Sequence, residues 1–222
     1  MSKVVHPYAH RLGIIKEWRH RWFATGPQYQ ENLKSDILLR EFLLKELRGM
    51  YVGGLEIERN KLLRVIIKTS RPGLIIGRSG EGSTKIKNSI QKFLQKHKLP
   101  VPEIKLDIEE IRSPESNAAI VSYMVAEGLE KRMPFRRVLK QTIEKVMANR
   151  DVKGVRIQIS GMLGSGSMSR TEGLKKGRIP LQTFRSDIDF HRERANLPLG
   201  VIGIKVWIYK GEIFAKGAKD AK

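Results

Sequence analysis

Two glycines bracket a short basic loop at residues 77–80, and this loop is the strongest single constraint on the fold of the chain. The loop consists of Gly77, Arg78, Ser79 and Gly80. Because glycine has no Cβ, a strand of nucleic acid can lie directly against the backbone of such a loop. The amides that begin the following helix then point at phosphate oxygens, and the guanidinium of Arg78 can pair with a phosphate. The sequence therefore predicts a clamp for a nucleic-acid backbone.

The segments that flank the loop agree with this prediction. Residues 62–68 have the pattern of a buried strand, a helical pattern runs from the loop to about His97, and residues 103–108 alternate as a strand. A strand, a short helix, a G-x-x-G loop, a helix and a strand make up the minimal KH domain. A simple turn between two helices can also use two glycines, and this alternative stays open. A dinucleotide-binding or Walker site does not fit, because neither glycine pattern is present.

Another helix and another strand are expected ahead of this unit. Thr25 and Gln28 have the spacing of a capping box, so the helix should begin there and end near Arg48, before a strand at residues 52–58. Its apolar residues are Leu33, Ile37, Leu44 and Leu47 on the side expected to be buried, and Leu38 and Phe42 on a second side that can also be covered. These additions give the type II KH arrangement, which we place at residues 25–112.

Residues 1–24 form an arm in which cations alternate with aromatic side chains. Such a mixture suits phosphate pairing and base stacking. We expect Trp18 and Trp22 to pack on the next helix. Three arginines of the arm are expected to bind RNA, namely Arg11, Arg19 and Arg21.

The overall charge points to a polyanionic partner. The chain has 43 Lys and Arg against 23 Asp and Glu, a formal net charge of +20. Neutralising phosphates with such an excess releases condensed counterions and favours binding to nucleic acid. The absence of cysteine excludes disulfides and thiolate chemistry. With no apolar run of membrane-spanning length and no signal-peptide pattern, we expect a cytoplasmic protein with no membrane partner.

A second domain is expected at residues 113–214, followed by a flexible tail at 215–222. Ser113 and Pro114 suit the N-cap and first position of a helix to about residue 131. A second helix is expected at 134–149. The strands are expected at residues 155–159, 181–194 and 201–209, after which the frayed tail begins. Helices followed by strands indicate a two-layer α/β domain with the helices packed on a sheet, so the whole chain is of the α+β class.

The second of these helices has one apolar and one basic face. The apolar stripe is Phe135, Val138, Leu139, Thr142, Val146 and Met147, and the opposite arc holds Arg136, Arg137 and Lys140. A charged face is usually only solvated. Here the neighbours four residues away are mostly cations, so an anionic partner is the better interpretation. We also expect RNA contacts from the basic segment that follows the next strand, at Arg170, Lys175, Lys176 and Arg178.

No catalytic centre is expected. Asp187 and Asp189 share one side of an expected strand and can in principle hold a metal or act as acid and base. Flanking arginines account for them more simply as ion pairs. The five histidines lack ligand spacing, and no nucleophile stands beside a base. The sequence indicates a binding protein without cofactor or metal.

With these residues in view, the chain resembles the universal uS3 family of small-subunit ribosomal proteins, in its bacterial or organellar form. The matching stretches span almost the whole length: 6–7, 11–14, 22–24, 71–78, 135–137, 160–164, 170–172, 177–181, 187–189 and 200–208.

The resemblance implies a type II KH domain and a family-specific α/β domain in the head of the small subunit. It implies binding to small-subunit rRNA and to neighbouring head proteins, and a surface that lines the mRNA entry channel. Arg136, Arg137 and Lys140 align with family cations implicated in gripping and unwinding incoming mRNA. Two alternatives stay open: a free-standing KH regulator of mRNA, and a nucleic-acid enzyme that uses Asp187 and Asp189.

Overall fold

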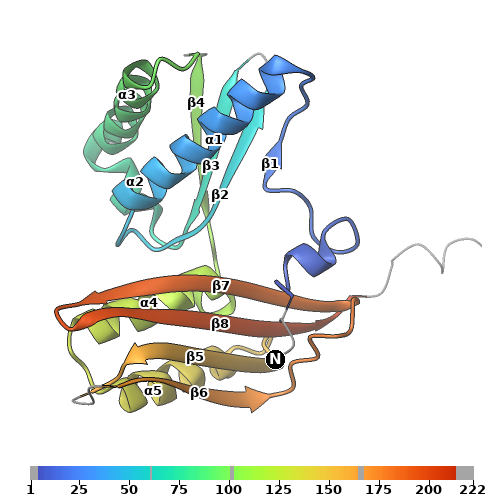
Figure 1. The fold of residues 1–222 in the computed structure, drawn as a ribbon, viewed down its shortest axis with the longest axis vertical. Coiled ribbons are helices and arrows are strands. Elements are labelled where there is room, and N and C mark those ends of the chain that lie inside the picture. Colours follow the sequence, from blue (N-terminus) through green and yellow to red (C-terminus); the bar gives the residue numbers. More distant parts are fainter. Residues whose placement is uncertain (1–4, 61, 101–102, 165–167, 214–222) are drawn as a thin grey trace, which may run out of the picture. The chain divides into compact units, whose positions relative to one another are not determined.

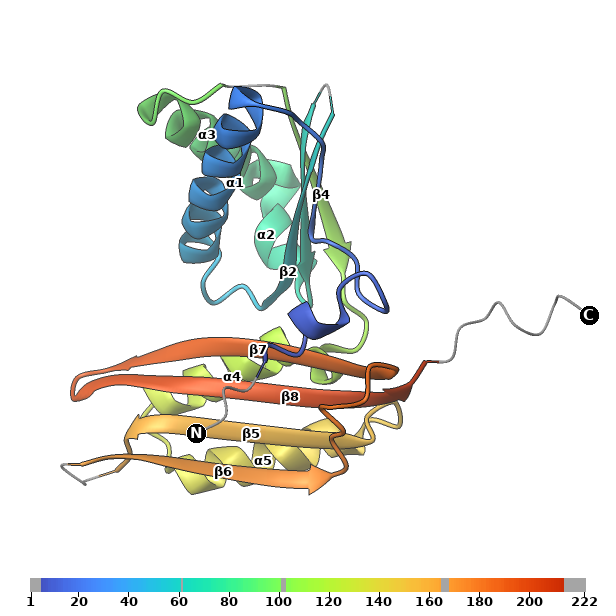
Figure 2. The same cartoon turned by 45° about the vertical axis from the view of Figure 1, so that its right-hand side comes forward.

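The chain forms two compact units, which Figures 1 and 2 show as ribbons. The computed structural model describes residues 5–60, 62–100, 103–164 and 168–213, and the expected tail lies outside them. One unit spans Trp18–Arg112; the other combines the residues up to Glu17 with those from Ser113 onward. No helix in the described ranges is long and apolar enough to cross a membrane. The mixture of helices and sheets in both units confirms the α+β class.

The first unit has the element order expected of a type II KH domain. Its elements are β1 (His20–Arg21), α1 (Pro27–Glu46), β2 (Val52–Arg59), β3 (Leu63–Thr69), α2 (Pro72–Ile76), the 3-10 turn η2 (Arg78–Gly80), α3 (Glu81–Lys96) and β4 (Ile104–Glu110). The sheet order is β1-β2-β3-β4, in which only the β2–β3 pair is antiparallel. All three helices lie on one face of this sheet (Figure 2), so its other face is open.

The buried face of α1 differs from the expected one. Leu33, Ile37 and Leu44 are 39%, 51% and 36% exposed, whereas Leu39 and Leu43 are fully buried. Phe42, on the second apolar side, stacks on Phe93 of α3 with ring centroids 4.4 Å apart. The prediction is confirmed for Leu47, which is 3% exposed, and wrong for the other three residues, because polar residues share the inner side of this helix.

Those polar residues are Ser35 and Asp36, both of which are buried. Asp36 accepts hydrogen bonds from Nε of Arg59 at 2.7 Å and from Nε1 of Trp22 at 2.6 Å. A paired carboxylate inside the helix packing breaks the apolar periodicity that the sequence argument used. The expected capping box is also absent, because Gly26 is the N-cap and no side chain caps the helix.

The second unit is a four-stranded antiparallel sheet covered on one face by two helices (Figure 1). Its elements are the 3-10 turns η1 (Ala9–Arg11) and η3 (Pro114–Ser116), α4 (Ala118–Glu130), α5 (Phe135–Ala148), β5 (Gly154–Met162), β6 (Ser169–Gly177), β7 (Ser186–Leu197) and β8 (Gly200–Glu212). The strand order is β6-β5-β8-β7. The α4 helix begins later than expected. Asn117 caps it by accepting from the amides of Ala119 and Ile120, so Ser113 and Pro114 belong to the preceding turn.

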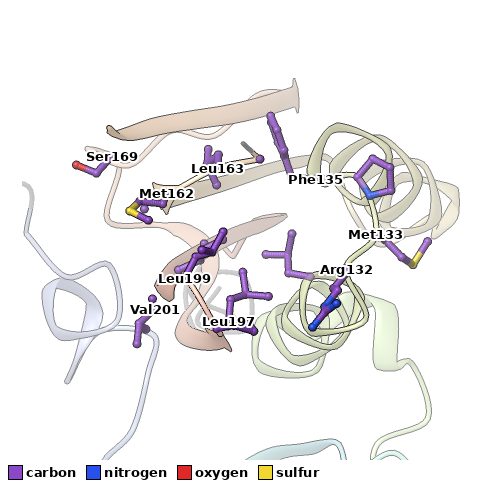
Figure 3. Close-up of a pocket in the computed structure, with 16 residues that line it drawn as sticks. Arg132, Met133, Phe135, Met162, Leu163, Ser169, Leu197, Leu199 and Val201 are labelled. Carbon is purple, nitrogen blue, oxygen red and sulfur yellow. The ribbon is translucent and has the colours of Figure 1, made fainter. Parts of the chain in front are cut away.

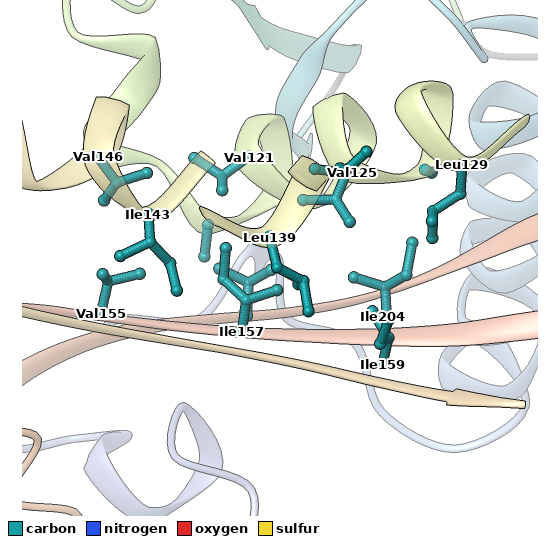
Figure 4. Close-up of a cluster of buried hydrophobic side chains, with 14 of the residues drawn as sticks. Val121, Val125, Leu129, Leu139, Ile143, Val146, Val155, Ile157, Ile159 and Ile204 are labelled. Carbon is teal, nitrogen blue, oxygen red and sulfur yellow. The ribbon is translucent and has the colours of Figure 1, made fainter. Parts of the chain in front are cut away.

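The core of the second unit lies between this sheet and α4 and α5. Figure 4 shows side chains of α4 and α5, among them Val121, Val125, Leu139 and Ile143, pointing toward Val155 and Ile157 of the sheet. Burying one such side chain stabilises the fold by about 1.5–3 kcal/mol. The α5 helix thus buries the stripe that its sequence predicts, and its basic arc faces away from the sheet.

Candidate nucleic-acid interface

The G-x-x-G loop is shaped by a close approach between its first glycine and the helix that follows. Gly77 has φ +70°, and a Cβ added there would lie 3.0 Å from the amide nitrogen of Gly82. A Cβ on Gly82 would lie 2.3 Å from the carbonyl oxygen of Ile75. Both positions require glycine, because α2 and α3 meet backbone to backbone. The close approach of α2 and α3 therefore sets the path of the loop between them.

The loop also exposes a cation at the start of α3. Arg78 and Ser79 are exposed, and Arg78 forms no ion pair with any described residue. Gly80 is the N-cap of α3, and no side chain caps the first turn. Its carbonyl oxygen accepts from the hydroxyl of Ser83 at 2.8 Å. The N-terminal end of α3 and the guanidinium thus offer an anion two favourable contacts side by side.

The basic arc of α5 forms a second exposed cationic surface. Arg136 is 73% exposed, and its Nε lies 3.6 Å from Oε2 of Glu172. Arg137 and Lys140 are exposed and form no ion pair within the described part of the chain. We call Arg136, Arg137 and Lys140 the α5 cations. Their charge is at most partly balanced from within the protein.

The basic segment expected after β5 is an edge strand, β6. Arg170 pairs with Oε1 of Glu172 at 3.1 Å. Lys175 lies opposite Arg156 on β5 and Lys176 lies opposite Val155, so the two lysines point to opposite faces of the sheet. The expected cations at 170–178 therefore do not form one surface. Arg178, which follows the strand, is exposed.

Arg11 requires a correction, because it is fully buried rather than available to RNA. Its Nε donates to the carbonyl oxygen of Ser186 at 2.7 Å, and its other nitrogens donate to the carbonyl oxygens of Pro7, Leu181 and Thr183 at 3.0, 3.0 and 2.9 Å. Burial lowers the pKa of Arg11, and the nearby carboxylate of Asp187 opposes this shift. The side chain thus ties the N-terminal segment to the second unit.

The rest of the arm divides between local packing and the KH sheet. Trp22 packs near Tyr29 with centroids 5.4 Å apart, as expected, whereas Trp18 is 69% exposed. The backbone carbonyl oxygen of Arg19 accepts a hydrogen bond from the amide of Ile57. Arg21 pairs with Glu56 and Glu58 at 3.0 and 2.8 Å. RNA contact by Arg19 and Arg21 stays a prediction.

The open face of the KH sheet is a network of matched charges. Arg64 donates to Asp107 and pairs with Glu58, and Lys68 lies 2.7 Å from Glu56. The hydrogen bond to Asp107 raises the pKa of Arg64. Partial burial acts to lower the pKa of Lys68, but its contacts with Glu56 and Glu109 together outweigh this effect and the pKa is raised. Ion pairs within the sheet thus account for this face without an external partner.

The two aspartates considered for catalysis have structural partners. Asp189 accepts a 2.8 Å hydrogen bond from the amide of Ala118, and Asp187 lies 2.7 Å from Nζ of Lys16. No group of three or more His, Cys, Asp or Glu among the described residues is arranged to hold a metal. Each carboxylate therefore joins two segments of the second unit.

A cavity of about 720 Å³ lies at one end of the second unit, beside the start of α5 (Figure 3). Its labelled side chains are Arg132, Met133, Phe135, Met162, Leu163, Ser169, Leu197, Leu199 and Val201. Most of them are apolar, and the polar ones do not include a carboxylate or a histidine. The lining of this cavity can therefore enclose an apolar group, but it does not supply a carboxylate or histidine for acid–base catalysis.

Two family models match the chain, one for each unit. The KH domain model matches residues 38–116, and the model described as Ribosomal protein S3, C-terminal domain, matches residues 125–208. The chain is similar to the small ribosomal subunit protein uS3 of Blochmanniella floridana, with 42% identity over 217 residues that cover 97% of this chain and 89% of the relative. The protein of the same name from Photobacterium profundum is 41% identical over 214 residues, which cover 96% of this chain and 90% of that relative. None of these descriptions names an enzymatic activity.

Proposed function

The chain belongs to the uS3 family of small ribosomal subunit proteins, and on this premise we propose that it is a structural constituent of the subunit head that grips incoming mRNA. In this proposal the KH unit holds small-subunit rRNA and the second unit lines the mRNA entry channel. Neighbouring head proteins are its other partners.

The observation that supports the mRNA contact is the unbalanced charge on α5. The α5 cations project away from the buried stripe, and two of the three make no ion pair with a described residue. Such a face favours a phosphate backbone, which releases counterions as it binds. An exposed surface with long cationic side chains can hold a moving strand without reading its bases.

The KH loop is better suited to a lasting contact with one RNA segment than to contact with a moving strand. Its glycines let a backbone approach closely, and Arg78 stands at the N-terminal end of α3. KH domains clamp short single-stranded segments in this way. We assign this contact to rRNA and the α5 contact to mRNA.

The test is translation through a stable mRNA hairpin by small subunits that carry the α5 cations replaced by alanine. These substitutions spare the core, so stability should change by no more than about 0.5 kcal/mol. Subunits should assemble, and translation should slow on the hairpin template but not on an unstructured one.

A variant with Lys34, Lys45 and Lys92 replaced by alanine is the matched control, because it loses the same charge from exposed positions on α1 and α3. It should translate both templates normally. Equal slowing on both templates, or failure of the α5 variant to enter subunits, would assign these residues to assembly instead. Loss of the wild-type protein from subunits in high salt would favour a free-standing KH regulator.

A further inference from the structure

We call the face of the second unit's sheet that α4 and α5 leave uncovered its open face (Figures 1 and 2). Part of it is covered by other segments, because Ile179 and Leu181 pack against the cluster of Ile188, Phe190, Trp207 and Tyr209, and the ring of His6 lies 4.7 Å from that of Phe190. Residues directly opposite each other on neighbouring strands share a face. Two rows therefore cross the sheet on this side from β6 to β7: Lys175, Arg156, Trp207 and Phe190 in the first, and Gly173, Gln158, Lys205 and Arg192 in the second.

Four cations stand in these two rows, and no described carboxylate stands with them. We call Arg156, Lys175, Arg192 and Lys205 the sheet cations. All four are exposed, and none forms an ion pair with a described residue. They also form like-charge pairs, because Arg156 lies directly opposite Lys175 and Lys205 lies directly opposite Arg192. Like charges in this position destabilise a sheet.

The KH sheet of the same chain shows the alternative arrangement. It too has four strands with helices on one face, but the cations on its open face alternate with carboxylates that pair with them. The two sheets share a chain and a solvent, so the basic composition alone does not explain two cationic rows in which no described carboxylate stands. An anionic partner does explain them.

The aromatic rings beneath these cations indicate which part of the partner is touched. Trp207 and Phe190 are each 6% exposed, so neither presents a free face to a base. The guanidinium of Arg156 lies 5.1 Å from the ring centre of Trp207, and that of Arg192 lies 5.6 Å from that of Phe190. The rings support the cations. Single-stranded RNA is usually held by stacking on exposed rings, which this face lacks, whereas double-helical RNA is bound through phosphates and shape.

We propose that the sheet cations form a docking surface for the phosphate backbone of a double-helical RNA segment. This inference rests on the proposed function only in that the partner is RNA. The site is separate from the G-x-x-G loop and the α5 cations, and it differs from both in the form of RNA that it takes.

The experiment measures binding of the full chain to two probes, a 20-base-pair RNA duplex of mixed sequence and an unstructured single strand of the same length. Replacing the four sheet cations by glutamine should weaken duplex binding about tenfold at moderate salt. The log–log salt dependence should flatten by about 0.9 for each lost phosphate contact, the value for double-helical DNA. Single-strand binding should change less than twofold. The free energy of unfolding should stay equal or rise, because like-charge pairs are removed.

The matched control replaces Lys34, Lys45, Lys92 and Lys96 by glutamine, which removes the same charge from α1 and α3. If both variants lose duplex affinity equally, the effect is net charge and the proposal is overturned. Unchanged duplex binding of the sheet variant together with weaker retention in subunits would assign the face to an acidic protein partner. Either result leaves the proposed function standing, whereas a wild-type protein that binds neither probe would overturn that function.

Discussion

The Nε of Arg11 donates a 2.7 Å hydrogen bond to the carbonyl oxygen of Ser186, a residue 175 positions later in the sequence. Three more carbonyl oxygens accept from the same guanidinium. The segment that ends at Glu17 is thereby part of the second unit, although the sequence places it ahead of the KH domain.

Replacing Arg11 by leucine should lower the free energy of unfolding by about 3 kcal/mol, because several buried carbonyl oxygens lose their donor together. Chemical denaturation measures this change. Arg150→Leu, at an exposed position after α5, is the control and should shift stability by no more than about 0.5 kcal/mol. Similar losses in both variants would show that the buried hydrogen bonds contribute little.

Paired substitutions in the KH loop should weaken single-strand binding and leave the fold intact. Arg78→Asp with Ser79→Asp places two carboxylates where a phosphate is expected. Ser79 has φ +53°, a region that aspartate tolerates better than most residues. Affinity for an unstructured RNA at moderate salt should fall at least about tenfold.

The control for this pair is Lys92→Asp with Gln95→Asp, which makes the same charge change near the other end of α3. Fluorescence anisotropy would compare the two variants at equal salt. If the loop variant binds as tightly as this control, the loop is only a turn between helices.

Acid should destabilise the KH unit through His20. Burial lowers the pKa of His20, with Asp36 opposing the shift and Arg40, Arg19 and Arg59 adding to it. The unfolded chain therefore takes up the proton first, so stability is complete above about pH 6.5 and falls as the pH drops below it. The free energy of unfolding should fall less between pH 7.5 and 5.5 in His20→Gln than in the wild type. The control is His97→Gln, at an exposed position. If the free energy of unfolding falls as much in His20→Gln as in this control, His20 is not the cause.

The parts of the fold with regular patterns were predictable from the sequence. The α5 stripe repeats at helical spacing and faces the sheet, and β5 alternates as a strand with one covered face. The G-x-x-G loop was recognisable because its two glycines, Gly77 and Gly80, take φ values of +70° and +82°, which favour glycine.

The elements that were missed lack such a pattern because tertiary contacts decide them. The β6 strand has the sequence Ser-Arg-Thr-Glu-Gly-Leu-Lys-Lys-Gly and lies at a sheet edge, where no row of apolar residues is needed. The inner side of α1 holds Asp36, whose partner Arg59 is 23 residues away. The burial of Arg11 depends on the carbonyl groups of Leu181, Thr183 and Ser186, which lie at least 170 residues later in the sequence.

The charge pattern of the open face of the second unit's sheet could not be predicted from the sequence either. Arg156, Arg192 and Lys205 are scattered in the sequence, and none was a predicted RNA contact. Only the strand order β6-β5-β8-β7 brings them beside Lys175. A sequence signal existed in the alternation of basic and apolar residues along β5 and β8, but it does not reveal which strands are neighbours.

The proposed contact between α5 and mRNA can be tested most directly by placing a photo-crosslinking amino acid at position 137 in small subunits loaded with a defined mRNA. The proposed function predicts crosslinks to mRNA nucleotides that have not yet entered the decoding site, and none from the same group at position 92. Crosslinks from position 137 to rRNA or protein alone would contradict it.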